Sequence, residues 1–393
     1  MEEKNERFGA RKRKIENALH LGPVSSAEDV PLIVNTPCYF AFGTNDKPAD
    51  YFRNPASMVR CQVEGWERHL KHVHDDAVPY FMPWYGTGVL ATAFGATVRF
   101  PERQGEDPSL TGPVIHSPVQ IARLPAPDPE RSGLMPRVLE TIALAKETCD
   151  LPVGLTDMNS PLSTVAQLCG YDKLFYWMYD DPQAVHDLFD LVTDAFIVWV
   201  KKQKACIGEP LNASNGLQGT WSPTGVGVWA SDDDLVILNP ELYAEFVVPR
   251  MKRLYATFGG GHLHFCGNGV HQVENILSIP GVRAVNNSPM GNFEVFSQLY
   301  RSIKGRIALQ IQDSTPLHPE IYYERLFSVI DDLRGVMLVS FTLDKIGINA
   351  EGKYEEAHWN AQDAANRAVE AIRGILENKS DSYSKRATMP GSR

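Results

Sequence analysis

Short apolar runs alternate with longer amphipathic segments along most of the chain. The short runs are rich in β-branched and aromatic residues and carry few polar positions, which is typical of strands buried on both faces. We therefore expect eight strands, at Leu32–Cys38, Val78–Pro83, Leu151–Thr156, Gly225–Ala230, His262–Cys266, Val282–Asn286, Arg306–Ile311 and Val336–Phe341.

The amphipathic segments carry the signals that begin a helix. Asp181-Pro182 and Asn239-Pro240 each combine a capping side chain with a proline suited to the first turn, and apolar residues follow both at helical spacing. Asn292 is a further capping candidate, and His318-Pro319 opens another amphipathic segment. Such segments separate the last four expected strands, which indicates repeated strand–helix units.

Alternation of strands and helices favours parallel pairing through right-handed crossovers. Eight strands favour a closed (β/α)8 TIM barrel of the α/β class. The alternative is an open doubly wound sheet, but no GxGxxG motif follows an early strand. We expect a charged helical N-terminal extension over residues 1–30, the barrel over residues 31–376, and a disordered tail over residues 377–393.

Composition narrows the possible classes of protein. The formal net charge is −10, whereas a nucleic-acid-binding protein usually carries a basic surface, so we expect no nucleic-acid partner. No apolar run approaches the roughly 18 residues that a membrane span needs. The six cysteines are widely spread and form no CxxC pair, as is typical of reduced thiols in a cytoplasmic protein. The oligomeric state stays open, with a homodimer as one option.

The strongest chemical signal is the segment HLHFCGNG, residues 262–269, at the end of an expected strand. Because alternate side chains share one face of a strand, His262, His264 and Cys266 point the same way. Imidazole nitrogen and thiolate sulfur are ligands that zinc prefers, and a catalytic zinc uses about three protein ligands. The spacing indicates a zinc site, although a buried cysteine and a hydrogen-bonded core histidine can give the same pattern.

An acidic loop follows the expected strand Gly225–Ala230. Asp232, Asp233 and Asp234 come directly after Ser231, and clustering raises the pKa of some carboxyl groups. The active site of a TIM barrel lies at the C-terminal ends of its strands. These aspartates are therefore candidates for general acid–base catalysis, cation binding or substrate binding. A solvated loop is the alternative interpretation.

Polar and aromatic residues also follow other expected strands. Polar side chains just beyond a strand end can contact a substrate or close a turn, and aromatic residues near glycines suit a flat or apolar ligand. Sorted by the role that we expect, the candidates are catalytic Asp233, Asp157 and Gln312, and substrate-binding Trp84, Tyr85, Asn159, Asp234 and Asn268.

Several of these segments together resemble the uroporphyrinogen decarboxylase superfamily. The similar segments are Thr156–Gly170 with the following Tyr179–Pro182, then Ser231–Pro249, then His264–Gly267. Their order and spacing extend the resemblance from Pro31 to Ile372. The resemblance implies a (β/α)8 barrel with its site in the mouth.

The superfamily contains two chemistries. Its decarboxylases remove acetate carboxyls from a tetrapyrrole and rely on an arginine-rich N-terminal motif, whereas the matching stretch here, Asn35–Phe40, has no arginine. Its corrinoid-dependent methyltransferases carry an HxC zinc motif, which His264 and Cys266 match, and usually a second cysteine near the last strand. The corresponding stretch, Ser340–Lys345, has no cysteine. Residues that could complete the ligand set instead are Asp344, Asp313, Glu294 and His262.

The resemblance therefore implies a corrinoid-dependent methyltransferase. The methyl group would move between a corrinoid, carried by a separate protein, and a small thiol or methyl-ether substrate, with zinc as a Lewis acid. Two alternatives stay open. One is a metal-free lyase that removes carboxyl groups as uroporphyrinogen decarboxylase does, and the other is a non-catalytic binding barrel.

Overall fold

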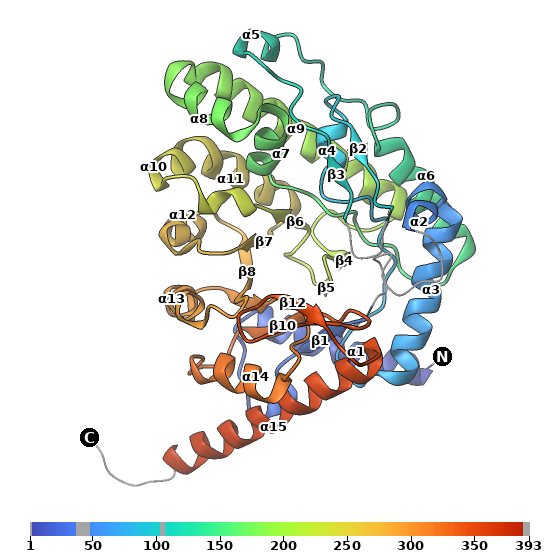
Figure 1. The fold of residues 1–393 in the computed structure, drawn as a ribbon, viewed down its shortest axis with the longest axis vertical. Coiled ribbons are helices and arrows are strands. Elements are labelled where there is room, and N and C mark those ends of the chain that lie inside the picture. The colour runs from blue at the N-terminus through green and yellow to red at the C-terminus, as the bar shows by residue number, and fades with distance from the viewer. Residues whose placement is uncertain (1, 37–47, 103–106, 388–393) are drawn as a thin grey trace.

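A parallel sheet forms the wall of a barrel, with helices on its outer side (Figure 1). The computed structural model describes residues 2–36, 48–102 and 107–387. The sheet has the order β1-β10-β9-β8-β7-β6, and every adjacent pair is parallel. These strands are β1 (Leu32–Asn35), β6 (Val228–Ser231), β7 (Gly261–Cys266), β8 (Val282–Ser288), β9 (Ala308–Ile311) and β10 (Val336–Phe341).

Two further segments complete the ring between β6 and β1. Asn159 forms a parallel bridge with Ser231 of β6, and Phe81 forms another with Val153. The segments around Phe81 and Val153 coincide with the second and third expected strands. The predicted (β/α)8 TIM barrel is thereby confirmed, although single bridges hold these two members of the ring.

The second segment is irregular because side chains take over part of its backbone hydrogen bonding. Gln62, on helix α3 (Pro55–His72), accepts from the backbone N–H of Met82 at 2.9 Å and donates to the Met82 carbonyl at 2.7 Å. Trp66, one turn further along the helix, donates its indole N–H to the carbonyl of Tyr80 at 2.7 Å. The chain is therefore extended and satisfied without a full strand ladder.

The third segment contacts a hairpin that the sequence pattern did not predict. Strands β4 (Ser214–Leu217) and β5 (Thr220–Ser222) lie inside the ring in Figure 1. Gly216 accepts a hydrogen bond from the backbone of Leu155 at 3.2 Å. A Cβ atom on Gly216 would lie 2.1 Å from the ring of Tyr80, so only glycine permits this close approach.

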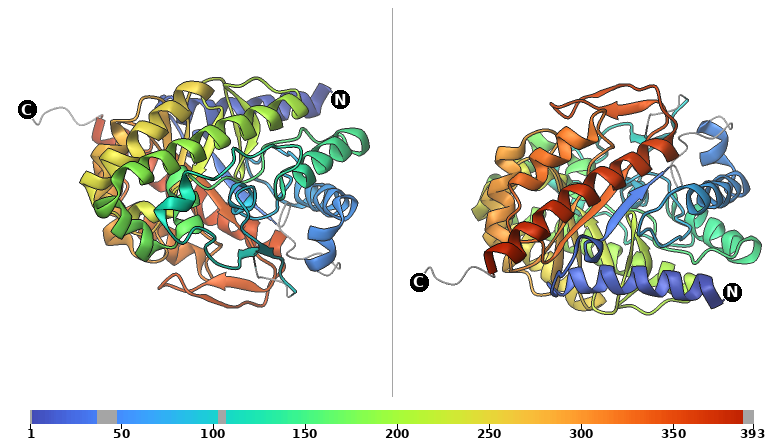
Figure 2. Two further views of the ribbon diagram at one scale, coloured as in Figure 1. Left: turned by 90° about the horizontal axis from the view of Figure 1, so that it is seen from above. Right: turned by 90° about the horizontal axis from the view of Figure 1, so that it is seen from below.

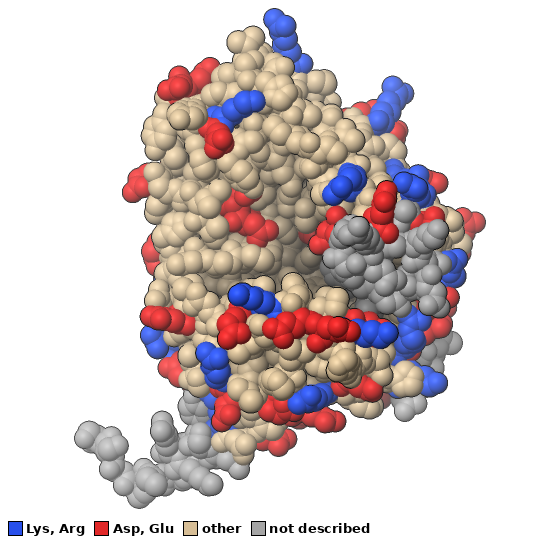
Figure 3. Space-filling model, viewed as in Figure 1, with Lys and Arg blue, Asp and Glu red and all other residues tan. Residues whose placement is uncertain are grey.

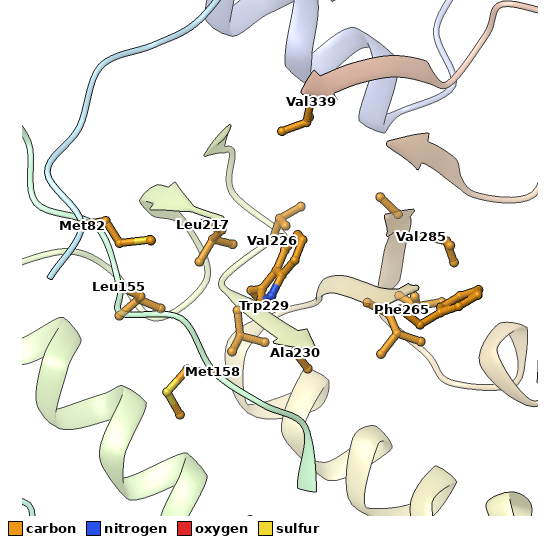
Figure 4. Packing of buried hydrophobic residues seen from close by; sticks show 14 of the residues in the cluster. Met82, Leu155, Met158, Leu217, Val226, Trp229, Ala230, Phe265, Val285 and Val339 are labelled. Atoms are coloured by element: carbon orange, nitrogen blue, oxygen red, sulfur yellow. The ribbon is translucent and has the colours of Figure 1, made fainter. Parts of the chain in front are cut away.

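The tip of the hairpin is fixed by polar contacts within the barrel. Gly219 donates its backbone N–H to the Tyr80 hydroxyl at 2.7 Å, and its carbonyl accepts from the Asn35 side chain at 3.2 Å. Figure 4 shows Leu217 in the same cluster of buried side chains as Met82. The hairpin thus fills barrel volume that strand side chains would otherwise occupy.

Several expected strands have different bounds in the structure. The strand expected at Arg306–Ile311 begins at Ala308, and the one expected at Val282–Asn286 continues to Ser288. The strand expected at Gly225–Ala230 begins at Val228, because Gly225 adopts a φ of +94° in the preceding turn. The strand expected at Leu32–Cys38 ends at Asn35, and its last two residues lie outside the described part of the chain.

The predicted helix starts are confirmed at three capping residues. The side chains of Asp181, Asn239 and Asn292 each accept a hydrogen bond from the backbone of the first helical turn. A further helix begins at Pro319 as expected, but His318 makes no capping hydrogen bond. The larger helices of the outer layer are α6 (Met135–Thr148), α7 (Pro161–Cys169), α8 (Tyr171–Asp180), α9 (Pro182–Ile207), α11 (Val248–Phe258), α13 (Phe293–Ile303) and α14 (Pro319–Ser328).

Short helices and two small antiparallel pairs lie in the connections between the members of the barrel. The short helices are α2 (Pro48–Arg53), α4 (Val89–Thr92), α5 (Pro118–Ile121), α10 (Pro240–Leu242) and α12 (Val273–Leu277). Two small antiparallel pairs are β2 (Val98–Arg99) with β3 (Ser109–Leu110), and β11 (Ile346–Ile348) with β12 (Tyr354–Glu356). Within the described residues, no helix is both long and apolar enough to span a membrane.

The two terminal helices meet the barrel from the same side. In the right-hand view of Figure 2, α1 (Glu2–Leu19) and α15 (Ala361–Ala387) lie across the face seen from below. The structure differs here from the expected tail, because the last helix continues through residues 377–387. Lys379 explains part of this continuation, since its ammonium donates to the carbonyl of Ile330 at 2.8 Å and to that of Phe327.

Asp76 joins both terminal helices to the seam between β1 and the second segment. Its backbone N–H donates to the Leu32 carbonyl at 2.7 Å, and its carboxylate accepts from the Leu32 N–H at 3.0 Å. The same carboxylate pairs with Lys14 of α1 at 2.8 Å and with Arg373 of α15 at 2.9 Å. One buried charge therefore holds three segments that are distant in sequence.

We predict that Asp76→Asn lowers the free energy of unfolding by about 2 kcal/mol, because the partly buried Lys14 and Arg373 lose their buried acidic partner and keep only the more exposed Glu28. Urea denaturation followed by circular dichroism measures this change. Glu274→Gln is the matched control, since Glu274 pairs with Arg306 at 2.7 Å on the surface. It should change the free energy of unfolding far less than Asp76→Asn does, because solvent screens a surface ion pair. Equal effects of the two substitutions would contradict a special role for Asp76.

Candidate metal centre

Strand β7 presents three chemically active side chains to the interior of the barrel. His262, His264 and Cys266 occupy alternate positions, as expected from the strand period. Between them, Leu263 and Phe265 are fully buried toward the outer helices. The polar residues of this segment therefore lie on the inner face of β7, and the apolar residues lie on its outer face.

Asp233, His264 and Cys266 form a cluster of three possible metal ligands. Their donor atoms all lie within 4.8 Å of one another. The His264 Nε2 is 3.5 Å from the Cys266 Sγ and 3.6 Å from the Asp233 Oδ1. The backbone N–H of Cys266 also donates to Asp233 Oδ1 at 2.7 Å, which ties the acidic loop to the end of β7.

His264 is held on three sides. Its Nδ1 bonds the side-chain oxygen of Asn286 at 2.7 Å. Its ring stacks on the indole of Trp229, with centroids 5.5 Å apart and planes inclined by 18°. Its backbone carbonyl accepts from the N–H of Asp232 at 2.7 Å. These contacts leave Nε2 directed toward Cys266 and Asp233.

The cluster is reached from the open end of the barrel. His264 is 7% exposed, whereas Cys266 and Asp233 are exposed to solvent. Figure 3 shows a hollow near the middle of this face, with acidic side chains along its edges. A ligand arriving from solvent can therefore reach the sulfur and the carboxylate before it reaches the imidazole.

The thiol of Cys266 needs a positive charge nearby to ionise at neutral pH. Desolvation, followed by the charge of Asp233, raises the pKa of Cys266 to about 12. A thiol with such a pKa is protonated at pH 7, and a bound cation reverses this preference because it stabilises the thiolate. The cluster is thus electrostatically suited to a metal cation.

Asp232 is a structural member of the acidic loop. Its carboxyl group is fully buried, where it accepts from Ser160 at 2.5 Å and from the Tyr243 hydroxyl at 2.7 Å. Desolvation raises the pKa of Asp232 to about 7. Tyr243 opens a π-helical stretch, Tyr243–Val247, which joins α10 to α11. Asp232 therefore anchors the loop from below, while Asp233 faces the mouth.

Asp157 lies in the barrel beside the cluster. Its carboxylate accepts from the Met158 N–H at 2.8 Å and from the Gln218 side chain at 3.2 Å. Ser231, the register partner of His264, lies 3.5 Å away. Desolvation raises the pKa of Asp157 to about 6, against an opposing effect of His264. Asp157 can therefore hold or release a proton near neutral pH.

The cluster contains none of the four other residues that we considered as ligands, which are His262, Asp313, Asp344 and Glu294. His262 is fully buried, and its Nδ1 accepts from the Gln310 side chain at 3.1 Å. Desolvation lowers the pKa of His262 to about 3, so its ring is neutral. Asp344 is exposed and accepts from the backbone N–H of Ala361, at the start of α15.

The expected substrate-binding residues divide between the mouth and the packed interior. Asp234 accepts from the Tyr171 hydroxyl at 2.8 Å, and Asn268 is exposed, with its side chain on the N–H of Val270. Tyr85 is buried, and its hydroxyl contacts Thr141 of α6 at 2.7 Å. This contact aims Tyr85 at the outer helices.

The remaining candidates are buried or partly buried. Trp84 is 4% exposed and packs against Phe52, with ring centroids 5.6 Å apart. Asn159 is 5% exposed and provides the backbone bridge to β6. Gln312 is half-buried, and its side-chain oxygen has no hydrogen-bond partner among the described residues.

Two residues that support His264 were not among our candidates. Asn286 and Trp229 lie on the neighbouring strands β8 and β6, and both face the barrel interior beside His264. A polar residue within the apolar run Val282–Asn286 was the available signal for Asn286. Its partner could be known only from the strand register, which pairs it with His264.

Asp313 is a further buried carboxyl group, located beyond β9. It accepts from Ser288 at 2.7 Å and from the Tyr322 hydroxyl. Desolvation raises the pKa of Asp313 to about 7, whereas these two hydrogen bonds lower it. The carboxyl group is 2% exposed, so folding removes it almost completely from water.

Comparison with known proteins supports the family resemblance. Residues 25–208 match the uroporphyrinogen decarboxylase (URO-D) family. A curated uroporphyrinogen decarboxylase from Halalkalibacterium halodurans is 28% identical over 155 residues, which are 37% of this chain and 39% of that protein. The match therefore spans well under half of the relative.

The fold as a whole is shared with a solved methyltransferase from Methanosarcina mazei. The two structures superpose with a TM-score of 0.61 at 16% sequence identity, over 95% of this chain and 99% of the other. At this identity the likeness establishes the fold. The match over residues 25–208 confirms the resemblance to the uroporphyrinogen decarboxylase superfamily.

We predict that Asp313 makes the protein less stable as the pH rises. A carboxyl group whose pKa is raised on folding keeps a proton that the unfolded chain releases above about pH 4. Its stabilising contribution is complete below that pH and is lost as the pH approaches 7. Between pH 5 and pH 8, the wild type should lose on the order of 3 kcal/mol more unfolding free energy than Asp313→Asn. Urea denaturation at both pH values measures the difference.

Asp172→Asn is the control for this prediction, because Asp172 is exposed on α8. It should keep the pH dependence of the wild type. The same pH dependence in wild type and Asp313→Asn would show that Asp313 does not retain its proton on folding.

Proposed function

We propose that this barrel, similar to uroporphyrinogen decarboxylase, transfers a methyl group between a corrinoid on a separate protein and a small thiol or methyl ether. The reaction would take place at a zinc ion held by Asp233, His264 and Cys266. The observation that carries the proposal is the meeting of three donor atoms of different kinds within 4.8 Å, at the open end of the barrel.

The donor set fits zinc on chemical grounds. Zinc in enzymes is bound by nitrogen, sulfur and carboxylate oxygen, and a catalytic site usually has three protein ligands and one position for water or substrate. A thiolate and a carboxylate together balance the two charges of the ion. The hydrogen bond from His264 Nδ1 to Asn286 is the kind of support that zinc-binding histidines have. Asp233 would supply the ligand that the missing second cysteine leaves open.

The zinc would supply Lewis acidity that keeps a coordinated thiol deprotonated, and the corrinoid of the partner would supply or accept the methyl group. The residues of this chain bind and orient the substrate and handle its proton. Asp157, with a pKa of about 6, can accept the proton of a thiol or donate one to the oxygen of a methyl ether. The indole of Trp229 gives the site an apolar wall.

The position of the cluster supports a partner that carries the corrinoid. A corrinoid is a broad ring bound to another protein, so its methyl group must be reached at an open surface. Cys266 and Asp233 are exposed at such a surface, and a hollow lies on this face in Figure 3. A substrate held there has access both to the barrel interior and to an approaching protein.

The alternative function is removal of a carboxyl group without metal. The match to the uroporphyrinogen decarboxylase family favours it, and Asp157 could serve as its acid. Against it, the stretch Asn35–Phe40 has no arginine to bind acidic substrate groups. Most of that stretch lies outside the described residues. The experiments below separate the two functions.

We predict about one zinc ion per chain in the purified protein. The double variant His264→Ala, Cys266→Ser should lose the metal, and Asp233→Asn should weaken zinc binding about 10–100-fold, since it removes a charged ligand. Elemental analysis and competition with a chelating dye measure content and affinity. Asp234→Asn is the matched control, because Asp234 lies one residue further along the loop and bonds Tyr171 instead.

Loss of zinc in Asp234→Asn but not in Asp233→Asn would place the metal on a different ligand set. Active wild-type enzyme that contains no transition metal would remove the Lewis-acid mechanism altogether.

Turnover should depend on a corrinoid. We predict that methyl transfer requires either a methylated corrinoid with a thiol acceptor or a reduced corrinoid with a methyl ether. The absorption change of the corrinoid follows the reaction, and Asp157→Asn should lower its rate by about 100-fold if Asp157 handles the proton. Decarboxylation of uroporphyrinogen in the absence of any corrinoid would contradict the proposal and favour the lyase.

A further inference from the structure

Four polar side chains form a chain of hydrogen bonds through the barrel interior, and it ends at the proposed metal ligand. From this chain we infer that Asn286 and Gln310, acting with His262, are positioning residues that select the tautomer of His264. The selected tautomer presents an unprotonated Nε2 to the metal. This inference rests on the proposed function, because it assigns a role to residues behind the same site.

This chain of hydrogen bonds follows the register of three neighbouring strands. His264 of β7 pairs with Asn286 of β8, and Asn286 pairs with Gln310 of β9. His264 Nδ1 lies 2.7 Å from Asn286 Oδ1, and Asn286 Nδ2 donates to Gln310 Oε1 at 3.3 Å. Gln310 Nε2 lies 3.1 Å from Nδ1 of His262, which is back on β7. The chain therefore begins and ends on one strand.

Each of these side chains is isolated from water. His262, Asn286 and Gln310 are fully buried, and His264 is 7% exposed. A buried amide or imidazole that loses its partner costs free energy comparable to a lost hydrogen bond. The members therefore constrain one another, since water cannot replace a missing partner at these positions.

The chemistry of the amides fixes which member of each hydrogen bond donates and which accepts. An amide nitrogen can only donate, and an amide oxygen can only accept. Gln310 Nε2 therefore donates to His262 Nδ1, which must be unprotonated. At the other end, Asn286 Oδ1 must accept a hydrogen bond from His264, so Nδ1 of His264 carries the hydrogen. The Nε2 of His264 is then unprotonated, and its lone pair is directed toward Cys266 and Asp233.

The opposite direction would disable the site. With both amides turned over, Asn286 would donate to His264 Nδ1, and the proton of His264 would move to Nε2. That proton would point at the place of the metal, and His262 would carry its own proton on Nδ1. The two histidines are thus coupled, because only one of them can have a protonated Nδ1 at a time.

The tautomer of His262, at one end of the hydrogen-bond chain, can change with the tautomer of His264 at the other end. His262 Nε2 has no hydrogen-bond partner among the described residues, so no neighbour dictates whether it carries the proton. A metal that binds His264 Nε2 fixes the direction of the chain, and this sets the proton of His262 on Nε2. His262 is then a reporter of metal binding two positions along the strand.

Substitutions of Asn286 test the positioning role through metal affinity. Asn286→Leu removes the acceptor with little change of shape and should weaken zinc binding 10–100-fold. Asn286→Asp keeps an acceptor for His264 Nδ1–H and should bind zinc within a few-fold of the wild type. Gln62→Leu removes an equally buried amide on the far side of the barrel and should leave zinc affinity unchanged.

Nitrogen-15 NMR of the histidine rings in the wild type tests the coupling without any variant. With zinc bound, we expect the proton of His264 on Nδ1 and that of His262 on Nε2. His271, whose Nε2 lies 3.2 Å from the Leu238 carbonyl, serves as a reference that does not change. In the metal-free protein, the proton should be on Nδ1 in one of the two coupled rings and on Nε2 in the other.

Two results would overturn the inference. One is a folded Asn286→Leu variant that binds zinc as the wild type does, and the other is protonation of both coupled rings at the same type of nitrogen. A wild type that binds no zinc would refute the proposed function, whereas the tautomers of the metal-free protein would still decide on the hydrogen-bond chain. The two failures are therefore distinguishable.

Discussion

The hydrogen bond between His264 Nδ1 and the side-chain oxygen of Asn286 determines what the mouth of this barrel can do. It is 2.7 Å long and buried, so the histidine cannot exchange it for water without cost. With this nitrogen occupied, the ring has only Nε2 for chemistry, and Nε2 faces Cys266 and Asp233. The proposed metal chemistry depends on this one constraint.

The barrel keeps that constraint in place through its frame. The register of β7 and β8 puts Asn286 beside His264, and the N–H of Asp232 binds the His264 carbonyl from the other side. At the opposite end, the Asp76 carboxylate joins β1 to both terminal helices. The exposed donors, Asp233 and Cys266, lie on the loop and the strand end at the mouth.

Much of the fold could be predicted from the sequence because periodicity reports burial directly. Eight apolar runs marked the members of the barrel, and the capping residues Asp181, Asn239 and Asn292 marked helix starts. The hairpin Ser214–Ser222 was missed because it is held by tertiary contacts, such as that of Gly216 with Tyr80, and carries no apolar alternation. The helix beyond residue 376 was missed because its composition is polar and its anchoring by Lys379 is tertiary.

The candidate site was predictable in part for the same reason. The strand period places His264 and Cys266 on one face, and the acidic loop was visible as a run of three aspartates. The sequence could not show which aspartate contacts His264. Asp232 and Asp233 are adjacent, but Asp232 is buried and Asp233 lies at the mouth. Local turn geometry after β6 makes that choice, and sequence patterns do not record it.

A crystal structure of the zinc-loaded protein, with anomalous scattering recorded at the zinc edge, tests the central claim most directly. The account predicts one strong anomalous peak bonded to His264 Nε2, Cys266 Sγ and a carboxylate oxygen of Asp233, with a zinc–sulfur distance of about 2.3 Å. A peak at other residues, or none at this cluster in crystals soaked with zinc, would contradict it.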